Sequence, residues 1–505
     1  MKTGFDNEKY LAEQTRYIME RLHSNNGKLY LECGGKLLYD YHASRVLPGF
    51  DPNVKMRVFQ SLKDQIDVII CIYAGDIEHR KIRSDFGITY DTDVFKMIDD
   101  FSQWGLKCDK VVITRFDEEE ETVLRFKDLL EMRGIHVYLH KATKGYPSDV
   151  DLIVSDEGYG ANPYIPTERP VVIVTAPGPG SGKLATCLSE MYHDWKAGRH
   201  SGYAKFETFP IWNLPIDHPV NIAYESATAD IGDKNRIDHY HLAAYGTVAV
   251  NYSRDLEAFP LLKRILEKIT GTDCVYKSPT DMGVNRCAFG IIDDAVVRKA
   301  AEQEIIRRYL HSASDYVQGL GTKETEERSK EIMQRCWLTE LDRPVVPAAR
   351  QALDMAITQN KGIGGVVCTA AIELPDGRIV TGHNSALMHA ASSVILNALK
   401  ALADIDQKTD LIPKTVVQSV TTVKRDILLG RGVSINLDEM LICLAMSAAI
   451  DANANKALSL LPSLKGCEMH LSHIPSSGDS SGLRKLGLHV TSDPKFPSTN
   501  VYNPV

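Results

Sequence analysis

The sequence predicts an α/β protein of several domains, with a Rossmann-like or P-loop-like parallel sheet in its N-terminal part. Short β-branched runs alternate with stretches of helical period from residue 57 onward, which is the signature of consecutive βαβ units. One of these runs, residues 171–175, leads into a glycine-rich loop and then into a helix-like segment. The 505 residues, 44% of them apolar, provide enough core for roughly two to four domains.

The N-terminal α/β domain is predicted to cover residues 1–225. A helix near residues 8–23 precedes a strand that ends in the glycine turn of residues 34–36. Period-two and β-branched runs predict further strands at residues 68–73, 111–114, 136–139, 152–154 and 171–175. Helical period predicts helices at residues 91–104 and 118–133, and glycine and proline mark a loop region at 198–219.

Two further domains are expected, a mostly helical middle domain at residues 226–342 and a C-terminal α/β domain at residues 343–505. The middle domain has helical period at residues 234–269 and 294–334, with a strand-like insertion at 274–292. The C-terminal domain begins with a hairpin that turns at Pro375-Asp-Gly377. After it come a helix at residues 385–402, strands at 468–473 and 488–491, and a serine- and glycine-rich turn at 475–482.

The glycine-rich loop Ala176-Pro-Gly-Pro-Gly-Ser-Gly-Lys183 is the main candidate site. Successive backbone N–H groups at a helix N-terminus form a cradle for phosphate, and a lysine in the first helical turn is better explained if an anion lies beside it. The predicted phosphate or nucleotide ligands are Gly178, Gly180, Ser181, Gly182, Lys183 and Thr186. The alternative is an ordinary tight turn between a strand and a helix, with glycines present for their backbone freedom.

Two departures from the P-loop signature G-x-x-x-x-G-K-[ST] bear on the cofactor. Pro177 stands in place of the first glycine, and Leu184 in place of the hydroxyl that binds magnesium. Thr186 is a substitute only from a different face of the helical turn. The sequence is therefore compatible with a bound nucleotide and argues against Mg²⁺ at this loop.

Charged residues follow the predicted strands, where parallel sheets bind their ligands. Arg80 and Arg83 come after residues 68–73, and Arg115 after residues 111–114, so they are candidates to compensate a phosphorylated ligand. Asp156 and Glu157 follow residues 152–154 and are the candidate general base or metal ligand. Lys36, in the turn Gly34-Gly35-Lys36, is a candidate for a second anion nest. For each of these side chains, simple solvation is the competing interpretation.

His239, His241 and Asp238 invite a metal hypothesis. Residues two apart on a helix point to different faces, so the two histidines share a metal only if this segment is extended. Asp238 and His241 are three apart and can share one helical face. A structural or substrate-contacting role is the alternative.

Composition excludes several classes of function. The net charge of −8 and isoelectric point near 6.1 argue against broad binding to nucleic acid. The N-terminal residues lack an apolar signal region and no apolar run reaches membrane-spanning length, so we expect a cytoplasmic protein without a membrane partner. The 10 cysteines are scattered without a C-x-x-C pair, which favours reduced core thiols. A homo-oligomer is compatible with the sequence.

Several motifs together resemble the bacterial family of domain of unknown function 1846 over the full chain. They are Glu32-Cys-Gly-Gly-Lys36, His42-Ala-Ser-Arg-Val-Leu-Pro-Gly-Phe50, Asp76-Ile-Glu-His-Arg-Lys-Ile-Arg83, Gly87-Ile-Thr-Tyr-Asp91 and the loop of residues 176–183. The resemblance implies a Rossmann-like N-terminal domain, a helical middle and a C-terminal α/β domain. It implies no particular activity.

The C-terminal domain resembles the cytidine-deaminase-like fold, in which H-A-E and P-C-x-x-C motifs hold zinc and a catalytic glutamate. Ala391 replaces the glutamate in Met388-His-Ala-Ala391, and Ser476 stands at the first cysteine position. The resemblance therefore implies the fold without its zinc chemistry.

Three functions follow from these candidates. The leading one is a protein that holds a nucleotide or phosphorylated small molecule at residues 178–183, as an enzyme of phosphoryl or nucleotidyl transfer. The second is a non-catalytic nucleotide or anion sensor. The third is a metal-dependent hydrolase that uses His239 and His241.

Overall fold

The computed structural model describes residues 2–25, 27–83, 87–117, 120–430 and 432–498. The chain divides into two compact units, Lys2–Ala301 and Glu302–Val505, and each is described by itself. The predicted division into three domains stays a prediction.

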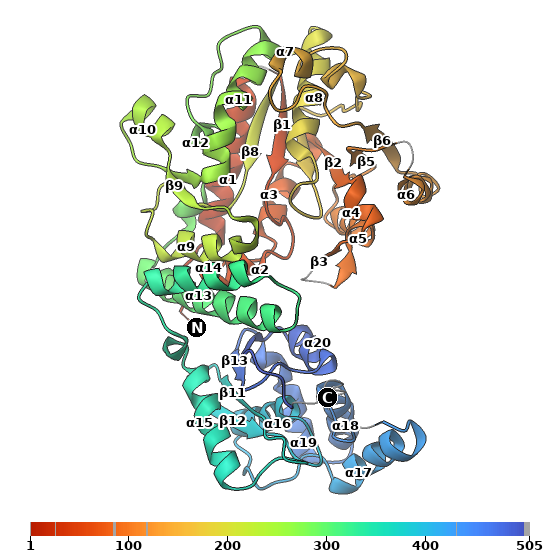
Figure 1. Ribbon diagram of the computed structural model, residues 1–505, viewed down its shortest axis with the longest axis vertical. Coiled ribbons are helices and arrows are strands. Elements are labelled where there is room, and N and C mark those ends of the chain that lie inside the picture. The colour runs from red at the N-terminus through yellow and green to blue at the C-terminus, as the bar shows by residue number, and fades with distance from the viewer. Residues whose placement is uncertain (1, 26, 84–86, 118–119, 431, 499–505) are drawn as a thin grey trace. The chain divides into compact units, whose positions relative to one another are not determined.

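The first unit is built on a six-stranded parallel sheet in the order β6-β5-β2-β7-β1-β8 (Figure 1), which confirms the predicted α/β class. β7 pairs with β1 on one side and with β2 on the other. The strands are β1 (Lys28–Cys33), β2 (Ile66–Tyr73), β5 (Lys110–Thr114), β6 (His136–His140), β7 (Val171–Thr175) and β8 (Ser201–Phe206).

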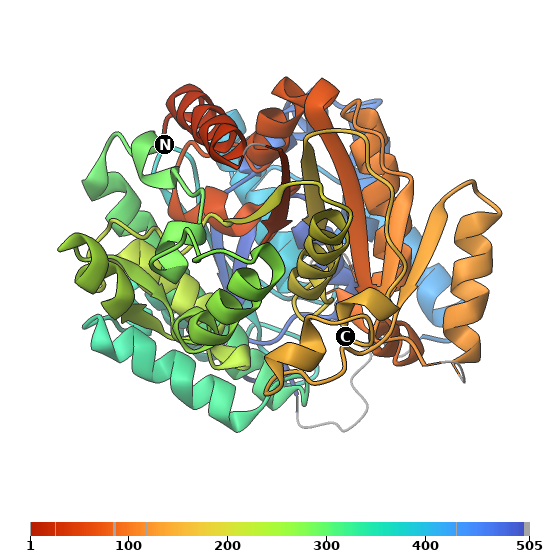
Figure 2. The same ribbon diagram turned by 90° about the horizontal axis from the view of Figure 1, so that it is seen from above.

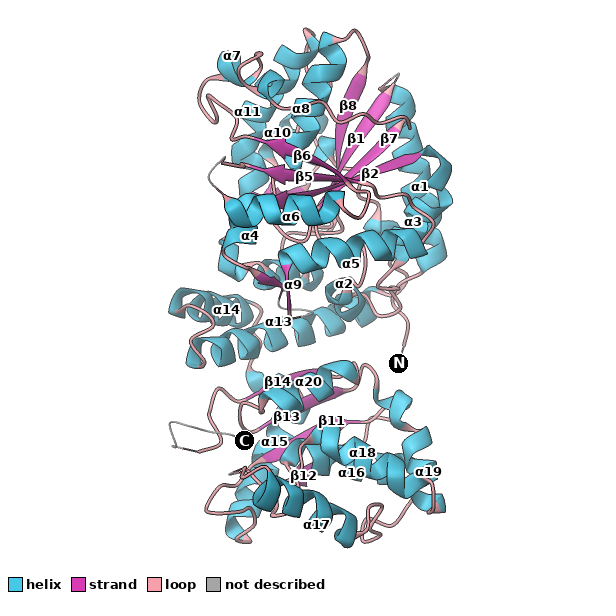
Figure 3. Cartoon of the chain, turned by 90° about the vertical axis from the view of Figure 1, so that its right-hand side faces the viewer, coloured by secondary structure: helices cyan, strands magenta, loops and turns pink. Residues whose placement is uncertain are grey.

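Helices cover both faces of this sheet (Figures 2 and 3). One face carries α1 (Asn7–Ser24), α3 (Val54–Ser61), α5 (Tyr90–Gln103) and α6 (Glu121–Glu131). The other carries α7 (Val150–Ile153), α8 (Lys183–Lys196) and α11 (Ser253–Thr270). Such a doubly wound arrangement buries both sheet faces, which explains the near-continuous apolar strands β2 and β7.

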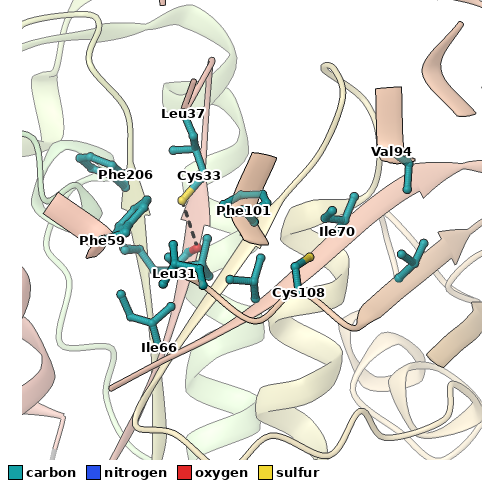
Figure 4. Close-up of a cluster of buried hydrophobic side chains, with 14 of the residues drawn as sticks. Leu31, Cys33, Leu37, Phe59, Ile66, Ile70, Val94, Phe101, Cys108 and Phe206 are labelled. Atoms are coloured by element: carbon teal, nitrogen blue, oxygen red, sulfur yellow. Dashed lines mark hydrogen bonds between the residues drawn. The ribbon is translucent and has the colours of Figure 1, made fainter. Parts of the chain in front are cut away.

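Strand alternation sorts the side chains of β1 and β8 between the two faces. Leu31, Cys33 and Phe206 lie in the core under α1 and α3 (Figure 4), where the Cys33 thiol contacts the Leu31 carbonyl oxygen at 3.7 Å. Tyr30 and Tyr203 belong to the core on the opposite face. Glu32 and Lys205, each two residues further along its strand, therefore face the side of α8 and α11.

The remaining elements of this unit are short and lie mostly around the carboxyl edge of the sheet. They are α2 (Tyr41–Val46), α4 (Ala74–Glu78), β3 (Ile82–Arg83), β4 (Ile88–Thr89), α9 (Pro219–Ala227), β9 (Asn235–Ile237), α10 (His239–Tyr245), β10 (Val250–Tyr252) and α12 (Pro279–Met282), with single 3₁₀ turns at Lys63–Gln65, Tyr159–Ala161, Ala229–Ile231 and Cys287–Gly290.

Two predicted elements of the sheet were wrong. Residues 152–154 are not a strand, because Asp149 accepts a hydrogen bond from the Leu152 amide and caps the short helix α7. The predicted loop region 198–219 contains the edge strand β8, whose inward Tyr203 and Lys205 alternate with Ala204 and Phe206. A lysine inside the apolar run, with glycines before it, concealed that strand.

The region after residue 226 also differs from its prediction. The stretch 234–269, predicted from its helical period, is helical in two parts, α10 and, from Ser253, α11, because β9 and β10 on either side of α10 pair as an antiparallel ribbon. The strand-like insertion at 274–292 is α12 and a 3₁₀ turn instead. α13 (Asp294–Val317) and α14 (Lys323–Arg335) confirm the later helical stretch.

The second unit contains a four-stranded sheet in the order β12-β11-β13-β14 (Figure 3), in which only β13 and β14 are parallel. The predicted hairpin is confirmed as β11 (Thr369–Glu373) and β12 (Ile379–His383). The other strands are β13 (Glu468–Leu471) and β14 (His489–Ser492). Besides α14 and the part of α13 from Glu302 onward, the helices of this unit are α15 (Val345–Thr358), α16 (Ala390–Ala403), α17 (Lys414–Thr422), α18 (Leu437–Ala448), α19 (Ala452–Ser459) and α20 (Ser477–Lys485), with a π-helical turn at Val423–Ile427 and 3₁₀ turns at Glu340–Asp342 and Leu461–Leu464.

Candidate anion site at the carboxyl edge of the large sheet

The connections after β1 and β7 leave the sheet toward opposite faces. The chain after β1 enters α2 and α3, and the chain after β7 enters α8 on the other face. Because β1 and β7 are neighbours, this point is a topological switch, where doubly wound sheets bind their ligands. The glycine-rich loop lies at this switch, as does the turn of residues 34–36.

The loop is held from behind by the last residue of β5 and the residue that follows it. Thr114 Oγ1 donates to the Ser181 carbonyl oxygen at 3.0 Å, and Arg115 Nη2 donates to the Gly180 carbonyl oxygen at 2.5 Å. Gly180 and Gly182 have φ values of 75° and 83°, in the left-handed region that glycine adopts without strain. The carbonyl groups are thereby engaged with β5.

The amide groups of the same loop are left open. Within the described part of the chain, the backbone N–H groups of residues 180–185 donate to no acceptor, and the first hydrogen bond of the helix runs from the Thr186 N–H to the Gly182 carbonyl oxygen. The Lys183 side chain is half-buried and forms no hydrogen bond or ion pair with a described residue. Open amides, a positive helix end and an unpaired ammonium together favour an anion.

Thr186 does not supply the missing metal ligand. Its hydroxyl is buried, donates to the Gly182 carbonyl oxygen at 3.1 Å and lies 3.4 Å from the Cys71 thiol. Both contacts are internal to the fold, so the hydroxyl is not presented at the loop.

The predicted arginines are placed unequally. Arg115 is brought to the loop, where its guanidinium also stacks on Tyr73 with 3.5 Å from Cζ to the ring centroid. Arg80 is exposed after α4 and has no partner in the described part of the chain. Arg83 belongs to β3, but its side chain lies outside what the structure describes. Lys36 is half-buried in the turn after β1 and already has partners.

A second group of charges, which sequence reasoning missed, follows β8 on the side of α8 and α11. Lys205 Nζ lies 2.5 Å from Asp255 Oδ2 and 3.1 Å from Glu207 Oε2. Glu32 Oε2 accepts a hydrogen bond from the Tyr203 hydroxyl at 2.6 Å. Only the spacing of Lys205 and Glu207 at the end of an alternating run signals this group in the sequence, and it depends on recognising β8.

Burial and neighbouring charges shift the pKa values of Glu207 and Lys205. Burial, together with the nearby carboxylates, raises the pKa of Glu207 to about 7 although Lys205 opposes the shift. Burial alone would lower the pKa of Lys205, but Asp255 and Glu207 hold it above its ordinary value. Glu207 is therefore a carboxyl group poised to exchange a proton near neutral pH.

Asp156 and Glu157 are not brought to the loop. Asp156 pairs with Lys196 and with the Tyr192 hydroxyl at the last turn of α8, and Glu157 lies 3.7 Å from Lys144. The loop is at the first turn of the same helix, about 20 Å away along its axis. The two acids follow α7 rather than a strand, so they face the amino edge of the sheet.

The histidine segment is held by hydrogen bonds. Asp238 is buried and caps α10 by accepting from the His241 amide, while its other oxygen accepts from the Thr280 hydroxyl at 2.7 Å. His241 Nδ1 lies 3.1 Å from the Ser278 hydroxyl, and His239 lies against Tyr240. In the described ranges, no three histidine, cysteine, aspartate or glutamate side chains are grouped to hold a metal.

The second unit has its own cluster of polar groups at helix N-termini. Asp479 Oδ2 accepts from His389 Nδ1 at 2.6 Å and from the Ser476 hydroxyl at 2.9 Å, and its Oδ1 accepts from the Leu437 amide at 2.9 Å. These residues lie at the starts of α16, α20 and α18. One buried carboxylate thus joins three helix N-termini.

The fold and the loop define a class, that of doubly wound α/β proteins with a glycine-rich loop at the topological switch. The model of domain of unknown function DUF1846, N-terminal, matches residues 3–336, and that of its C-terminal domain matches residues 341–502. The chain belongs to this family.

Full-length relatives agree with the family match. A UPF0371 protein of Fusobacterium nucleatum is 56% identical over 506 residues, and one of Clostridium tetani is 53% identical over 503 residues. Each alignment covers 99% of both chains. Separately, none of the helices in the described ranges combines the length and apolar character needed to cross a membrane.

Proposed function

We propose that this protein binds a phosphorylated small molecule at the loop of residues 176–183. The observation that carries the proposal is the row of amides at the start of α8 beside Lys183, none of which has a partner among the described residues. An anion there accepts the orphan donors of the helix and neutralises a lysine that otherwise opposes the helix dipole.

The same geometry supports binding more strongly than magnesium-dependent transfer. Leu184 offers no hydroxyl, and Thr186 is engaged with Gly182 and Cys71. Asp156 and Glu157 lie at the far end of α8, which argues against them as the acid or base of a reaction at the loop. Glu207, at the loop's own edge of the sheet, is the better candidate for that role.

The second unit supports a relationship to the cytidine deaminases in fold, but not in zinc binding. Its strand order, with β11 antiparallel to both neighbours and β13 parallel to β14, suits the cytidine-deaminase-like fold. On that proposed relationship, His389, Ser476 and Asp479 would stand where that fold has its three zinc ligands. A serine and an aspartate do not replace two thiolates well, and Asp479 already accepts three hydrogen bonds, so the residues do not fit zinc.

A thermal-shift screen on the full chain tests the proposed site. Inorganic phosphate, pyrophosphate, sugar phosphates and nucleotides are compared with and without magnesium on the wild type, on Lys183→Ala and on Lys196→Ala. Lys196 is the matched control because it lies on the same helix at its far end. A ligand at a hundred times its Kd adds about 2.7 kcal/mol of apparent stability, a shift of a few degrees.

We expect a phosphate-bearing hit in the wild type and in Lys196→Ala that is lost in Lys183→Ala. Lys183→Ala without ligand should unfold no earlier than the wild type, because it removes a cation from a helix N-terminus. Equal stabilisation of all three proteins, or none in any of them, would refute the proposal.

A further inference from the structure

A small pocket opens at the carboxyl edge of the large sheet, beyond β8 and beside the N-terminus of α11. Its volume is about 40 Å³, and its lining includes Lys205, Glu207, Phe209, Trp212, Asn251 and Asp255. A space of this size admits a few water-sized groups. It is too small for a nucleobase and suits a hydroxyl or hydroxymethyl group.

The pocket and the glycine loop share one edge and one face of the sheet. β1 alone separates β7 from β8, so the ends of these two strands are about 10 Å apart. Both Lys183 and Asp255 lie in the first turn of a helix on this face, α8 and α11 respectively. The two sites are therefore close enough for one small molecule to reach both.

Gly34 connects the two sites. It ends β1 between them, and its amide donates to the Phe206 carbonyl oxygen at 2.9 Å. A side chain at this position would collide with the carboxyl group of Glu207. The glycine lets the Glu207 carboxyl lie over the end of β1, on the side toward the loop.

The polar groups that line the pocket leave acceptors rather than donors for a ligand. The Asn251 amide donates to Thr280 Oγ1 and accepts from the Tyr252 amide. Glu207 Oε1 and Asp255 Oδ1 accept no hydrogen bond from the described residues, since Lys205 contacts the other oxygen of each. A matching ligand group must bring hydrogen-bond donors.

Charge selects hydroxyl groups over an ammonium group. Lys205 compensates one of the two carboxyl groups, Arg254 of α11 lies close enough to act on both of them, and Lys183 adds a further cation nearby. Groups of four other elements also face Glu207, namely Glu32 of β1, Asp255 of α11, Tyr224 of α9 and Tyr252 of β10. Phe209 and Trp212 give the pocket an apolar wall, which suits the carbon skeleton of a polyol.

We propose that the pocket is the second half of the ligand site and that the ligand is a sugar phosphate, with hydroxyl groups bound by Glu207 and Asp255. This inference rests on the proposed function, because the glycine loop places the phosphate. Glu207 is then a residue that contacts the ligand and selects it.

The test compares Kd values by calorimetry for four probes: inorganic phosphate, ribose 5-phosphate, glucose 6-phosphate and phosphoethanolamine. The proteins are the wild type, Glu207→Gln, Lys183→Ala and Glu157→Gln, the last as an exposed control outside the site. At least one sugar phosphate should bind the wild type about tenfold or more tightly than inorganic phosphate, the effect of one charge-assisted hydrogen bond.

Glu207→Gln should remove most of that advantage, weakening the binding of the sugar phosphate about tenfold more than the binding of inorganic phosphate. Lys183→Ala should weaken the binding of both probes, and Glu157→Gln should weaken the binding of neither. Unchanged thermal unfolding of Glu207→Gln excludes loss of fold as the cause, and Asp255→Asn offers a second variant of the pocket if it does not.

The other outcomes refute either this inference alone or the proposed function as well. If inorganic phosphate binds through Lys183 but sugar phosphates gain nothing, or gain it equally in Glu207→Gln, this inference fails and the proposed function stands. If phosphoethanolamine binds more tightly than either sugar phosphate, the pocket takes an ammonium group and the inference is overturned. If no probe binds the wild type, both fail together.

Discussion

Each of the two units brings helix N-termini to the ends of strands, but only one fills them with its own carboxylate. In the second unit Asp479 accepts from His389, Ser476 and the Leu437 amide and is nearly inaccessible. In the first unit the start of α8 has open amides and a lysine in place of an acid. The two sites have the same elementary geometry with opposite charge at the centre.

This difference shows that a helix N-terminus can serve either as a structural joint or as a binding site. Unsatisfied amides at a helix N-terminus require an acceptor. Where the chain supplies a buried acceptor, the result is a fixed joint between helices. Where it supplies a half-buried cation instead, the acceptor has to come from outside, and the site can bind and release it.

The largest expected effect is on the filled site. Asp479→Ala leaves the His389 ring, the Ser476 hydroxyl and the Leu437 amide without their acceptor, and removal of one partner from a buried charged group costs about 3–5 kcal/mol. We expect an earlier thermal transition and faster hydrogen–deuterium exchange across α18, with exchange in α8 unchanged. Equal exchange in α18 of both proteins would contradict the structural role of Asp479.

Asp479→Asn is the conservative control, because it keeps one acceptor oxygen and removes the charge. Its thermal midpoint should lie between those of the wild type and Asp479→Ala.

Acid should also lower the stability of the wild type, because it removes the charge of Asp479. Burial opposes the charge of Asp479, but the hydrogen bond from His389 and its other donors hold its pKa below the ordinary 3.8. The stability that it contributes is present above pH 3.8 and is lost as pH falls through the lower pKa of the folded state.

The next largest effect is on the backbone of the open site. Gly182→Ala forces an alanine into the left-handed backbone region, with φ of 83°, and places its Cβ 2.8 Å from the Thr114 side chain. Gly198→Ala is the matched control, because Gly198 has φ of 73° and no atom within 4 Å of an added Cβ. Both should lose about 1 kcal/mol to strain, and Gly182→Ala should lose more. Urea unfolding of both variants measures the difference, and equal midpoints would contradict the packing of the loop on β5.

An effect confined to a pH range follows from Glu207. Its pKa rises from 4.5 to about 7 on folding because of burial, so the folded state binds more protons than the unfolded state between these values. Stability should therefore fall as pH rises from 4.5 to 7, by roughly 3 kcal/mol. Glu207→Gln should flatten this part of the profile. Denaturant titrations at several pH values test this, and parallel profiles for the two proteins would contradict it.

The sequence predicted the large sheet well where its signals were local. The run Val171–Thr175 and the glycine loop were correctly placed, because β-branched strands and left-handed glycines leave a direct pattern. Strand β8 was missed, because Lys205 in an apolar run is explained by its pairing with Glu207 and with Asp255, the latter fifty positions along the chain. The candidate site was accordingly half predicted: the loop, Lys183 and Arg115 are together, while Glu207 and Asp255 depend on tertiary contacts that no local pattern reports.

The acids Asp156 and Glu157 show the reverse error, and they provide the smallest predicted effect. Three apolar residues before an acidic pair resemble a strand end, but Asp149 starts a helix there. The pair with Lys196 is exposed, and such pairs contribute little to stability. Asp156→Ala should therefore leave both the thermal midpoint and any phosphate-dependent shift unchanged. If it abolished the shift while Lys183→Ala did not, the ligand would lie at the amino edge of the sheet, and the contrast between an open and a filled helix N-terminus would lose its functional meaning.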